Sequence, residues 1–541
     1  MANPVYPQEL LPDETFLPPR IPYAAYRHAV PSGPWPWFDL IDDDAPFPLV
    51  PSAIDNLPDS VNPEQVSQAH TWRKYPELFF PNWTPLRLKK SRIDRVISQQ
   101  SDRPCVLYNI DVGCDGHFSQ ADRHLVTKEN EENFWTMMTE RRLDRNRVRL
   151  LFVENLSGRV LQMLGARYTI EPFFFSSSLN WIPSRYQESV KQNHGDHITI
   201  TLTFLRTMAN PMTTSNTPSV GRQSFSHIMS RDGTRTIDVQ APLILKSRDD
   251  SRILLLDLIA LHMVRRKDAS GSTVISYHPT PEWKSTSALY LHSRVRYAGE
   301  SVYWQELFRQ SQDPTLVLLC MLWHPLYAWD ESFEILYTHI CSLESRVLSE
   351  NDIHLTRELH IIRAYLLHYA SLLEIFRKTI IFLRDTPNPA MQDHVEYQKS
   401  ANVMSRECDT LMSEIERLEM FRRMQEMRLD NVMKFNPFGK ELISYLTMIF
   451  LPASFVASVF GMNLADLQNG AFGTLAHYFE VVIPLTGLTI WIIVALHQNQ
   501  ARHDDVGTGI FHRLRWPIRS VKYMITLMGK RGQRVDEGVQ G

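Results

Sequence analysis

The sequence has few cysteines and no large excess of charge of either sign. It contains 5 cysteines among 541 residues, they are widely spaced, and no C-x-x-C pair occurs. This spacing argues against a disulfide framework and a zinc ribbon, and it suits a reducing cytosol. The formal net charge of −3 argues against a nucleic-acid partner, because such proteins usually carry a basic domain or patch.

The common phosphate-binding and nucleophile motifs are also absent. The chain has no G-x-x-x-x-G-K-[ST], no G-x-G-x-x-G and no G-x-S-x-G. His194 and His197 have a spacing that could hold a metal, but they lie at an expected junction of loop and strand with no cysteine or acidic cluster evident nearby. We favour ordinary surface histidines there over ligands. We therefore expect neither an enzyme nor a resident cofactor.

Residues 1–100 lack apolar periodicity and an apolar run of the kind that signal peptides contain. Fourteen prolines fall within the first 63 residues. The segment is not arginine- and serine-rich either, so we expect neither a secretory signal nor an organellar transit peptide. This composition predicts a Pro-rich extended arm that is draped on the fold or partly disordered.

Two long apolar runs lie near the C-terminus. Residues 442–460 contain no charged side chain, and residues 478–497 contain one, Glu480. A helix of nineteen residues is about 28 Å long, close to the hydrocarbon thickness of a bilayer. With a short connection at residues 464–477, the pattern predicts a helical hairpin that crosses a membrane twice, with the lipid bilayer as partner.

A stripe of mostly hydroxyl side chains follows one face of the first run. Its members recur at spacings of 3 and 4: Ser444, Thr447, Leu451, Ser454 and Ser458. Such residues can bond their own helix carbonyls or pack helix on helix. Alternatively, the stripe faces water and Leu451 is an apolar constriction in it, which requires several copies around an axis.

The first run ends in Gly461-Met462-Asn463, followed by a short loop and a second span. This arrangement, together with residues 447–452, Phe455 and Ala457, resembles the CorA family of divalent-cation channels, in the manner of a divergent member of the fungal type. The resemblance implies a homopentamer that transports Mg²⁺, with Mg²⁺ also as a possible cytosolic regulator. It assigns the selectivity filter to Gly461, Met462 and Asn463.

The chemistry of Mg²⁺ fits this assignment. The ion gives up its water reluctantly, so a ring of Asn463 carboxamides would bind the hydrated ion through its water molecules. The pore would be lined by the hydroxyl stripe, and Asp466 and Glu480 would concentrate cations at the outer mouth. Asn463 alone could equally be a helix cap.

Flanking charge predicts the topology. Basic residues stand before the first run and after the second, whereas residues 464–477 contain no lysine or arginine. By the positive-inside rule both termini are cytoplasmic, including a basic tail at residues 498–541. We favour the plasma membrane over an organelle.

The preceding residues predict an α+β cytosolic domain and a long helical stalk. In residues 101–285, segments 148–153, 197–204, 253–264 and 273–277 read as strands, 156–164 and 172–179 as helices, and 206–235 as a surface insertion. Residues 286–441 read as helical. Apolar residues keep a 4-3 alternation from Leu355 to Leu383, which predicts a coiled-coil seam that Thr386-Pro387 ends.

A further helix from about residue 392 carries a second seam, from Met404 to Leu418. Arg422 and Gln425 continue its register, as part of either a wet vestibule or a solvated face. Asn436-Pro437 is expected to kink or break this helix. Two alternatives to a Mg²⁺ channel stay open: a Zn²⁺ transporter of the ZntB kind, and a non-conducting membrane-anchored sensor or scaffold.

Overall fold

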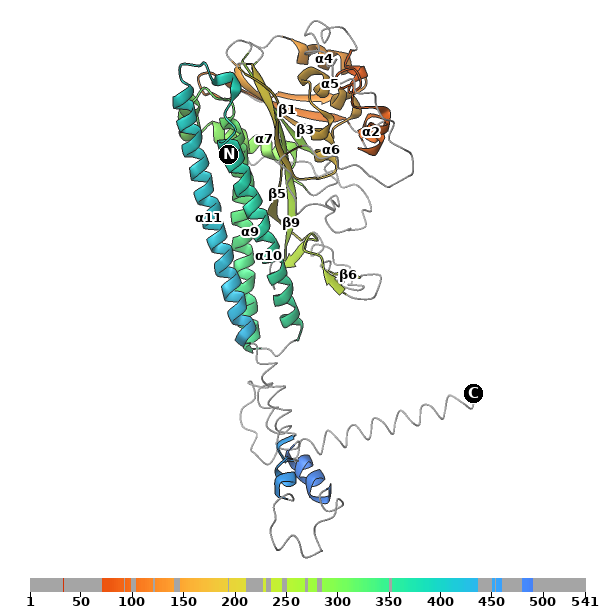
Figure 1. The fold of residues 1–541 in the computed structure, drawn as a ribbon, viewed down its shortest axis with the longest axis vertical. Coiled ribbons are helices and arrows are strands. Elements are labelled where there is room, and N and C mark those ends of the chain that lie inside the picture. Colours follow the sequence, from red (N-terminus) through yellow and green to blue (C-terminus); the bar gives the residue numbers. More distant parts are fainter. Residues whose placement is uncertain are drawn as a thin grey trace, which may run out of the picture. The chain divides into compact units, whose positions relative to one another are not determined.

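Figure 1 shows the computed structural model of the chain. It describes Gly33 and residues 71–91, 93–98, 104–119, 122–140, 146–192, 194–210, 227–229, 235–245, 251–267, 271–279, 285–349, 353–435, 450–452, 454–459 and 479–489. The chain divides into two units, one of residues 1–346 and 354–432 and the other of residues 347–353 and 433–541. The first unit contains a large mixed sheet and the packed parts of three long helices.

Eight strands form the sheet, in the order β2-β1-β3-β10-β9-β5-β4 with β8 paired to β9. Only β3 and β10 run parallel; the other pairs are antiparallel. The strands are β1 (Cys105–Gly113), β2 (Asp122–Val126), β3 (Asn146–Glu154), β4 (Ser184–Lys191), β5 (Gly195–Ala209), β8 (Leu243–Leu245), β9 (Arg252–Arg266) and β10 (Ser272–His278). The four strands expected from residues 148–153, 197–204, 253–264 and 273–277 are confirmed as β3, β5, β9 and β10.

Both faces of the sheet are covered, so successive side chains of a strand are buried alternately on one face and on the other. Leu151 and Val153 belong to a core cluster that also contains residues of α5 (Gly158–Tyr168) and α6 (Pro172–Leu179). Phe152 faces the other way and packs on His292 of α7 (Ala288–Gly299), with 5.5 Å between the ring centroids. Burial on two faces explains why β5 and β9 read as nearly continuous buried runs.

Residues 71–98 are part of the folded domain, contrary to the expected arm that ends at residue 100. They form η2 (Thr71–Lys74), α2 (Pro85–Lys90) and α3 (Ile93–Ser98). Trp72 and Tyr75 lie in the core cluster, and the Tyr75 hydroxyl donates a 2.7 Å bond to the Ile170 carbonyl. A Cβ at Gly158 would lie 2.4 Å from the Val96 carbonyl oxygen, so glycine permits α3 to approach α5. The part of the arm before residue 71 lies outside the described residues, apart from Gly33.

The shorter helices begin at side-chain caps, as their sequences favour. Ser157, Ser287 and Ser301 each accept a hydrogen bond from a backbone amide in the first turn of the helix that follows. α6 begins with Pro172 at its first position and has the bounds that the sequence predicted, and α5 occupies most of the other expected helix. The remaining short helices are α4 (Glu131–Thr139), α8 (Val302–Gln310) and η4 (Pro389–Met391).

Part of the expected surface insertion at 206–235 is strand. β5 continues to Ala209, and a separate hairpin joins β6 (His227–Met229) to β7 (Arg235–Ile237). Residues 211–226 and 230–234 lie outside the described residues. The insertion therefore begins later than we expected.

Three long helices follow: α9 (Leu316–Ser349), α10 (Ile353–Arg384) and α11 (Tyr397–Phe435). Both expected seams are confirmed as buried: Leu355, Leu359, Ile362, Leu366, Tyr369, Leu373, Phe376, Ile380 and Leu383 on α10, and Met404, Cys408, Leu411, Ile415 and Leu418 on α11. α10 stops before Thr386-Pro387, as predicted. α11 starts at Tyr397, later than expected, and ends at Phe435; the expected break at Asn436-Pro437 lies outside the described residues.

Candidate functional site

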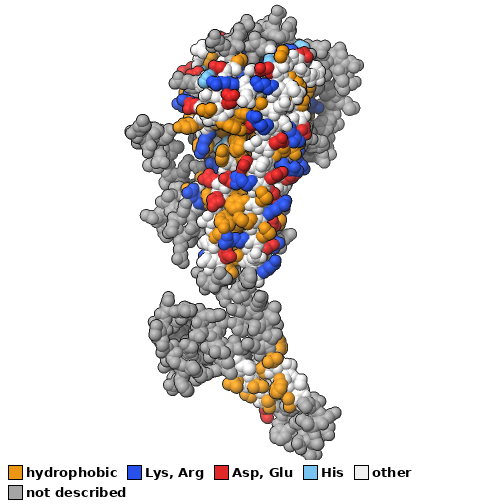
Figure 2. Space-filling model, turned by 90° about the vertical axis from the view of Figure 1, so that its left-hand side faces the viewer, with side chains coloured by type: hydrophobic (Ala, Val, Ile, Leu, Met, Phe, Trp, Pro, Cys, Tyr) orange, Lys and Arg blue, Asp and Glu red, His pale blue; other side chains and the backbone are white. Residues whose placement is uncertain are grey.

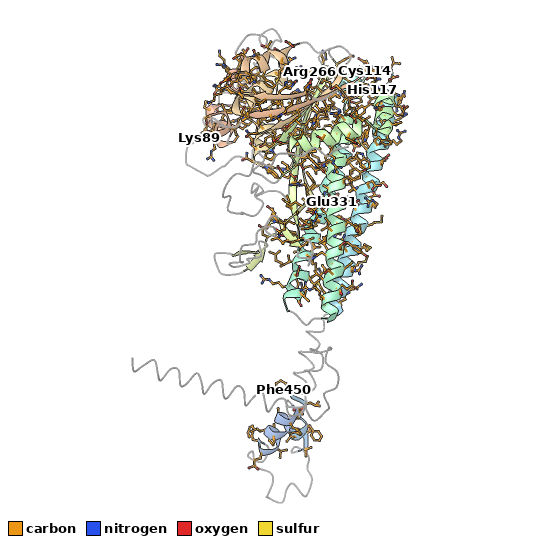
Figure 3. All side chains as sticks on the ribbon, turned by 180° about the vertical axis from the view of Figure 1, so that it is seen from behind. Lys89, Cys114, His117, Arg266, Glu331 and Phe450 are labelled. Atoms are coloured by element: carbon orange, nitrogen blue, oxygen red, sulfur yellow. The ribbon has the colours of Figure 1, made fainter. Side chains whose placement is uncertain are left out.

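The second unit carries part of the expected pore helix. Residues 450–452 and 454–459 are helical, and so are residues 479–489. Leu451, Ser454 and Ser458 are exposed in the single chain, as is Glu480. Phe450, labelled in Figure 3, and Phe455 are also exposed, at 62% and 65%. The helix therefore presents apolar and hydroxyl side chains that its own unit leaves uncovered.

The other residues of the predicted site lie outside the described residues. They are Ser444, Thr447, Gly461, Met462, Asn463 and Asp466. Among the described residues, none of the helices combines the length and the hydropathy that crossing a membrane requires. The predicted spans at 442–460 and 478–497, the connection at 464–477 and the tail at 498–541 lie partly or wholly outside the described part of the chain.

One hydroxyl of the stripe makes a local bond. The Ser454 Oγ donates to the Leu451 carbonyl at 3.0 Å, within its own helix. This bond resembles the local alternative, in which hydroxyl side chains donate to backbone carbonyls of their own helix. A hydroxyl that donates in this way keeps its oxygen lone pairs as acceptors, so the bond is compatible with either role.

The expected polar end of the α11 seam is neither a wet vestibule nor a solvated face. Arg422 is 5% exposed and Gln425 is fully buried. The Gln425 side chain donates to the Phe333 carbonyl of α9 at 2.8 Å, and Arg422 donates to the Leu366 carbonyl of α10 at 3.3 Å. These polar residues fix α11 to the two neighbouring helices, which corrects both interpretations.

A different face of α11 carries exposed methionines. Met420, Met424 and Met427 are 64%, 39% and 62% exposed and recur at spacings of 4 and 3. Figure 2 looks onto the side of the molecule where α11 lies, and hydrophobic side chains there stand among charged ones. An apolar stripe on a helix that its own chain leaves uncovered is a candidate contact for another helix.

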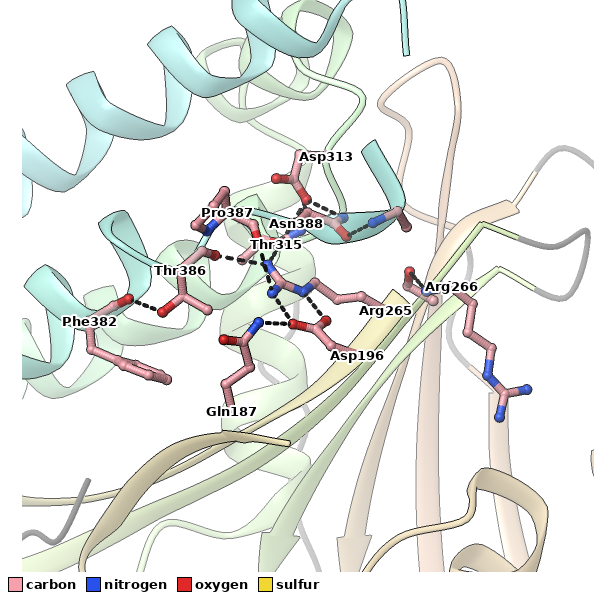
Figure 4. Close-up of polar contacts among 12 residues, drawn as sticks. Gln187, Asp196, Arg265, Arg266, Asp313, Thr315, Phe382, Thr386, Pro387 and Asn388 are labelled. Atoms are coloured by element: carbon pink, nitrogen blue, oxygen red, sulfur yellow. Dashed lines mark hydrogen bonds and ion pairs between the residues drawn. The ribbon is translucent and has the colours of Figure 1, made fainter. Parts of the chain in front are cut away.

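A buried ion pair joins the sheet to the long helices (Figure 4). Arg265 of β9 pairs with Asp196 of β5, and both side chains are fully buried. The guanidinium also donates to the Thr315 hydroxyl at 3.2 Å and to the carbonyls of Thr386 and Pro387 at 3.1 and 3.3 Å. Thr315 precedes α9 and Thr386 follows α10. All five N–H groups of Arg265 are therefore used at the junction of two strands and two helices.

His197 is not an ordinary surface histidine. His194 is exposed, as expected, but His197 is buried on β5. The nearby acid that we did not expect is Glu188, which lies directly opposite His197 on β4. His262 of β9 completes the group, with its Nε2 3.3 Å from the Nδ1 of His197. The interpretation of this pair as solvent-exposed is thus wrong for His197.

Residues 298–497 match the family model for the CorA-like Mg²⁺ transporter protein. Residues 298–497 belong to that CorA-like family. The matched region contains α8 to α11, both apolar runs and Gly461-Met462-Asn463. Because the matched family is one of transporters, the expectation that the chain is not an enzyme is confirmed.

No curated protein matches the chain. Among solved structures, the complete CorA magnesium transporter from Methanocaldococcus jannaschii is 10% identical, with 73% of this chain and 98% of that chain covered and a TM-score of 0.39. For the full-length CmaX protein the values are 10%, 75%, 100% and 0.33. For the ZntB cytoplasmic domain from Vibrio parahaemolyticus RIMD 2210633 they are 8%, 62%, 98% and 0.32.

The match over residues 298–497 is to a family of divalent-cation transporters, which are membrane proteins. The described part of the chain has the α+β domain followed by long helices that the sequence predicted. The family assignment is based on the sequence match over residues 298–497, since the structural similarities are too low to add to it.

Proposed function

We propose that this protein is a homo-oligomeric channel for divalent cations, most simply Mg²⁺. The observation that carries the proposal is the CorA-like match over residues 298–497, which spans both apolar runs and the Gly461-Met462-Asn463 motif between them. Hydrated ions would meet a ring of Asn463 carboxamides first. Asp466 and Glu480 would raise the cation concentration at that mouth by Coulomb attraction.

Below the ring, the path would be lined by Ser458, Ser454, Thr447 and Ser444, with Leu451 as the apolar constriction. Their hydroxyls can accept hydrogen bonds from the ion's water molecules, and a ring of leucines can close a path by excluding water. An inside-negative membrane potential supplies about 4.6 kcal/mol per 100 mV for a divalent ion, so that uptake needs no nucleotide site.

The pore requires several copies, because a single helix cannot enclose a path. The exposed methionine stripe of α11 supports assembly, since Met420, Met424 and Met427 would lose water contact against a neighbouring copy. We propose a pentamer, as the family resemblance implies. Both termini would be cytoplasmic, and the plasma membrane is the membrane that we favour.

Ion flux into liposomes tests the proposal. We expect the purified full-length chain to admit Mg²⁺ under an inside-negative potential and the Asn463→Ala variant to lose most of that flux. Asn469→Ala is the matched control, because it removes the same carboxamide six residues further along the loop, and it is expected to conduct. Equal flux in wild type and Asn463→Ala contradicts the proposed filter.

The same assay separates the alternatives. Flux of Zn²⁺ in preference to Mg²⁺ supports a transporter of the ZntB kind. No flux of either ion from correctly assembled wild-type protein supports a non-conducting sensor or scaffold.

A further inference from the structure

Three side chains that could act as metal ligands lie close together in the sheet of the first unit. Glu188, His197 and His262 come from three neighbouring strands, β4, β5 and β9. Glu188 is the direct cross-strand partner of His197, and His262 is the partner of Thr199, two residues along the same face. Because side chains alternate along a strand, all three project to the face that α6 covers.

The distances between the three side chains suit one shared ion. The ring nitrogens of His197 and His262 that face each other are 3.3 Å apart, and His197 Nδ1 is 4.0 Å from the Glu188 Oε1. One ligand atom from each residue lies within 4.8 Å of the others. Two nitrogens bound to one tetrahedral Zn²⁺ at about 2.0–2.1 Å are roughly 3.3–3.4 Å apart. The imidazoles already have that separation. The Glu188 carboxylate, whose Oε1 lies 4.0 Å from His197 Nδ1, would have to move somewhat closer.

The protein itself gives Glu188 little compensation for burial. Burial raises the pKa of Glu188 well above its usual value, and the adjacent carboxyl of Glu171 raises it further. Among the described residues, no lysine or arginine forms an ion pair with Glu188, and the Nδ1 of His197 lies 4.0 Å from its Oε1. Burial also lowers the pKa of His197 to about 3, helped by the positive charges of Arg266 and Lys191. Neutral imidazole is the form that binds metals.

The histidine rings are held in the orientation that a ligand needs. The hydroxyl of Thr199 lies 2.9 Å from the Nδ1 of His262, and the Phe174 ring of α6 packs on the imidazole with centroids 4.9 Å apart. When Nδ1 donates its proton to Thr199, the lone pair of Nε2 points at His197. A hydrogen-bond partner on the outer nitrogen is the usual support of a metal-bound histidine.

An ion could reach the group from one side. The side chains of Glu188 and His197 are 15% and 11% exposed, whereas His262 is fully buried. Three protein ligands leave a fourth position for water. Glu171 stands next to Glu188 and receives a 3.4 Å hydrogen bond from the Trp83 indole, so it can accept from such a water or replace it.

We propose that Glu188, His197 and His262 bind one divalent transition-metal ion of the zinc class. Two imidazoles and one carboxylate favour Zn²⁺ over Mg²⁺, which prefers oxygen ligands and retains its water. The site belongs to the sheet domain and is independent of the hydrated-ion path proposed for Asn463. Metal binding would link β4, β5 and β9 directly through their side chains.

Zinc titration of the full-length chain in detergent tests the site. We expect one Zn²⁺ per chain to survive gel filtration, and Co²⁺ in its place to give the strong visible absorption of a tetrahedral complex. His262→Gln and Glu188→Gln should each bind at least tenfold more weakly. His194→Gln is the matched control and should bind as wild type does, because that imidazole is exposed and lies outside the cluster.

Glu188→Gln also guards against a folding artefact. Glutamine has nearly the same shape as glutamate, so the metal-free variant is expected to unfold close to the wild-type temperature. Asn463→Ala should bind Zn²⁺ normally, so failure of the channel proposal and failure of this site are distinguishable. Undiminished binding in both His262→Gln and Glu188→Gln, or loss in His194→Gln, overturns the proposal.

Discussion

Two buried polar clusters lie on opposite faces of β5 and β9, and the cost of burying their polar groups is compensated in different ways. On the face toward the long helices, Asp196 and Arg265 neutralise each other and every donor of the guanidinium has an acceptor. On the opposite face, His197, the next residue on β5, lies beside His262 and Glu188. Among the described residues, no guanidinium or ammonium group forms an ion pair with Glu188. Figure 4 shows Arg266, the next residue on β9, pointing away from the Asp196 cluster.

The difference teaches what each cluster can do. A complete ion pair with all of its hydrogen bonds made has no capacity left for a ligand, so its role is to hold elements together. A group of neutral nitrogens beside a buried carboxyl has lone pairs and latent negative charge to offer a cation. Burial alone does not distinguish them; the presence of an internal counter-charge does.

Breaking the Asp196–Arg265 pair should have the largest effect on stability. Arg265→Met leaves Asp196 buried without its partner, and we expect a loss of about 3–5 kcal/mol in the free energy of unfolding. Thermal or denaturant unfolding of the full-length chain measures it. The double variant Asp196→Leu with Arg265→Met removes both charges and should recover much of the loss.

The matched control for this experiment is an exposed pair on α7. Arg296 and Glu300 lie 3.1 Å apart with side chains about half exposed. We expect Glu300→Gln to change the free energy of unfolding by less than about 0.5 kcal/mol, because solvent screens such pairs. A loss of several kcal/mol in Glu300→Gln, or no loss in Arg265→Met, would contradict the distinction between the pairs.

A buried histidine on the Arg265 face sharpens the comparison through its pH dependence. The ring nitrogens of His278 lie 2.8 Å from the Thr286 carbonyl and 3.0 Å from the Ser276 hydroxyl, so neither is free for a metal. Burial lowers the pKa of His278 to about 4. Because the unfolded chain takes up a proton near pH 6.5 and the folded chain does not, stability falls as the pH drops from 6.5 towards 4.

We expect this one histidine to account for about 2 kcal/mol of the stability lost between pH 7 and pH 5. His278→Gln should reduce that loss by the same amount, whatever it does to stability at pH 7. Unfolding midpoints measured across the pH range give the slope. Identical slopes for the two proteins would show that His278 is protonated in the fold.

Much of the fold could be predicted from the sequence where burial leaves a period. The 4-3 seams of α10 and α11 and the apolar runs of β5 and β9 were read correctly because their core faces are continuous. The aromatic residues of 71–98 were missed, since Trp72, Tyr75, Phe79 and Trp83 keep no single period and stand between prolines. The surroundings of Arg422 and Gln425 were predicted wrongly, because the sequence does not show that a polar residue in a seam can donate to a backbone carbonyl of a neighbouring helix.

The two candidate sites differ in the same way. The predicted ion path is a pattern local to one segment, so its residues could be named before any fold was known. The cluster in the sheet depends on the register that sets Glu188 opposite His197. β4, with the sequence SRYQESVK, carries no apolar alternation that would have identified it as a strand. A site assembled across strands is invisible until their pairing is known.

A smaller loss is expected when the hydrogen bond that supports the His262 ring is removed. Thr199→Val removes the hydroxyl that faces its Nδ1 while keeping the branched shape, and we expect Zn²⁺ affinity to fall about tenfold, or ~1.4 kcal/mol. Thr199→Ser, which retains a hydroxyl, should restore most of the affinity. The unfolding temperature of the metal-free protein provides a separate reading of packing. If Thr199→Val and Thr199→Ser bind Zn²⁺ equally, the hydroxyl does not orient the ring. The difference in metal binding between the two faces would then depend on Glu188 and the two imidazoles alone.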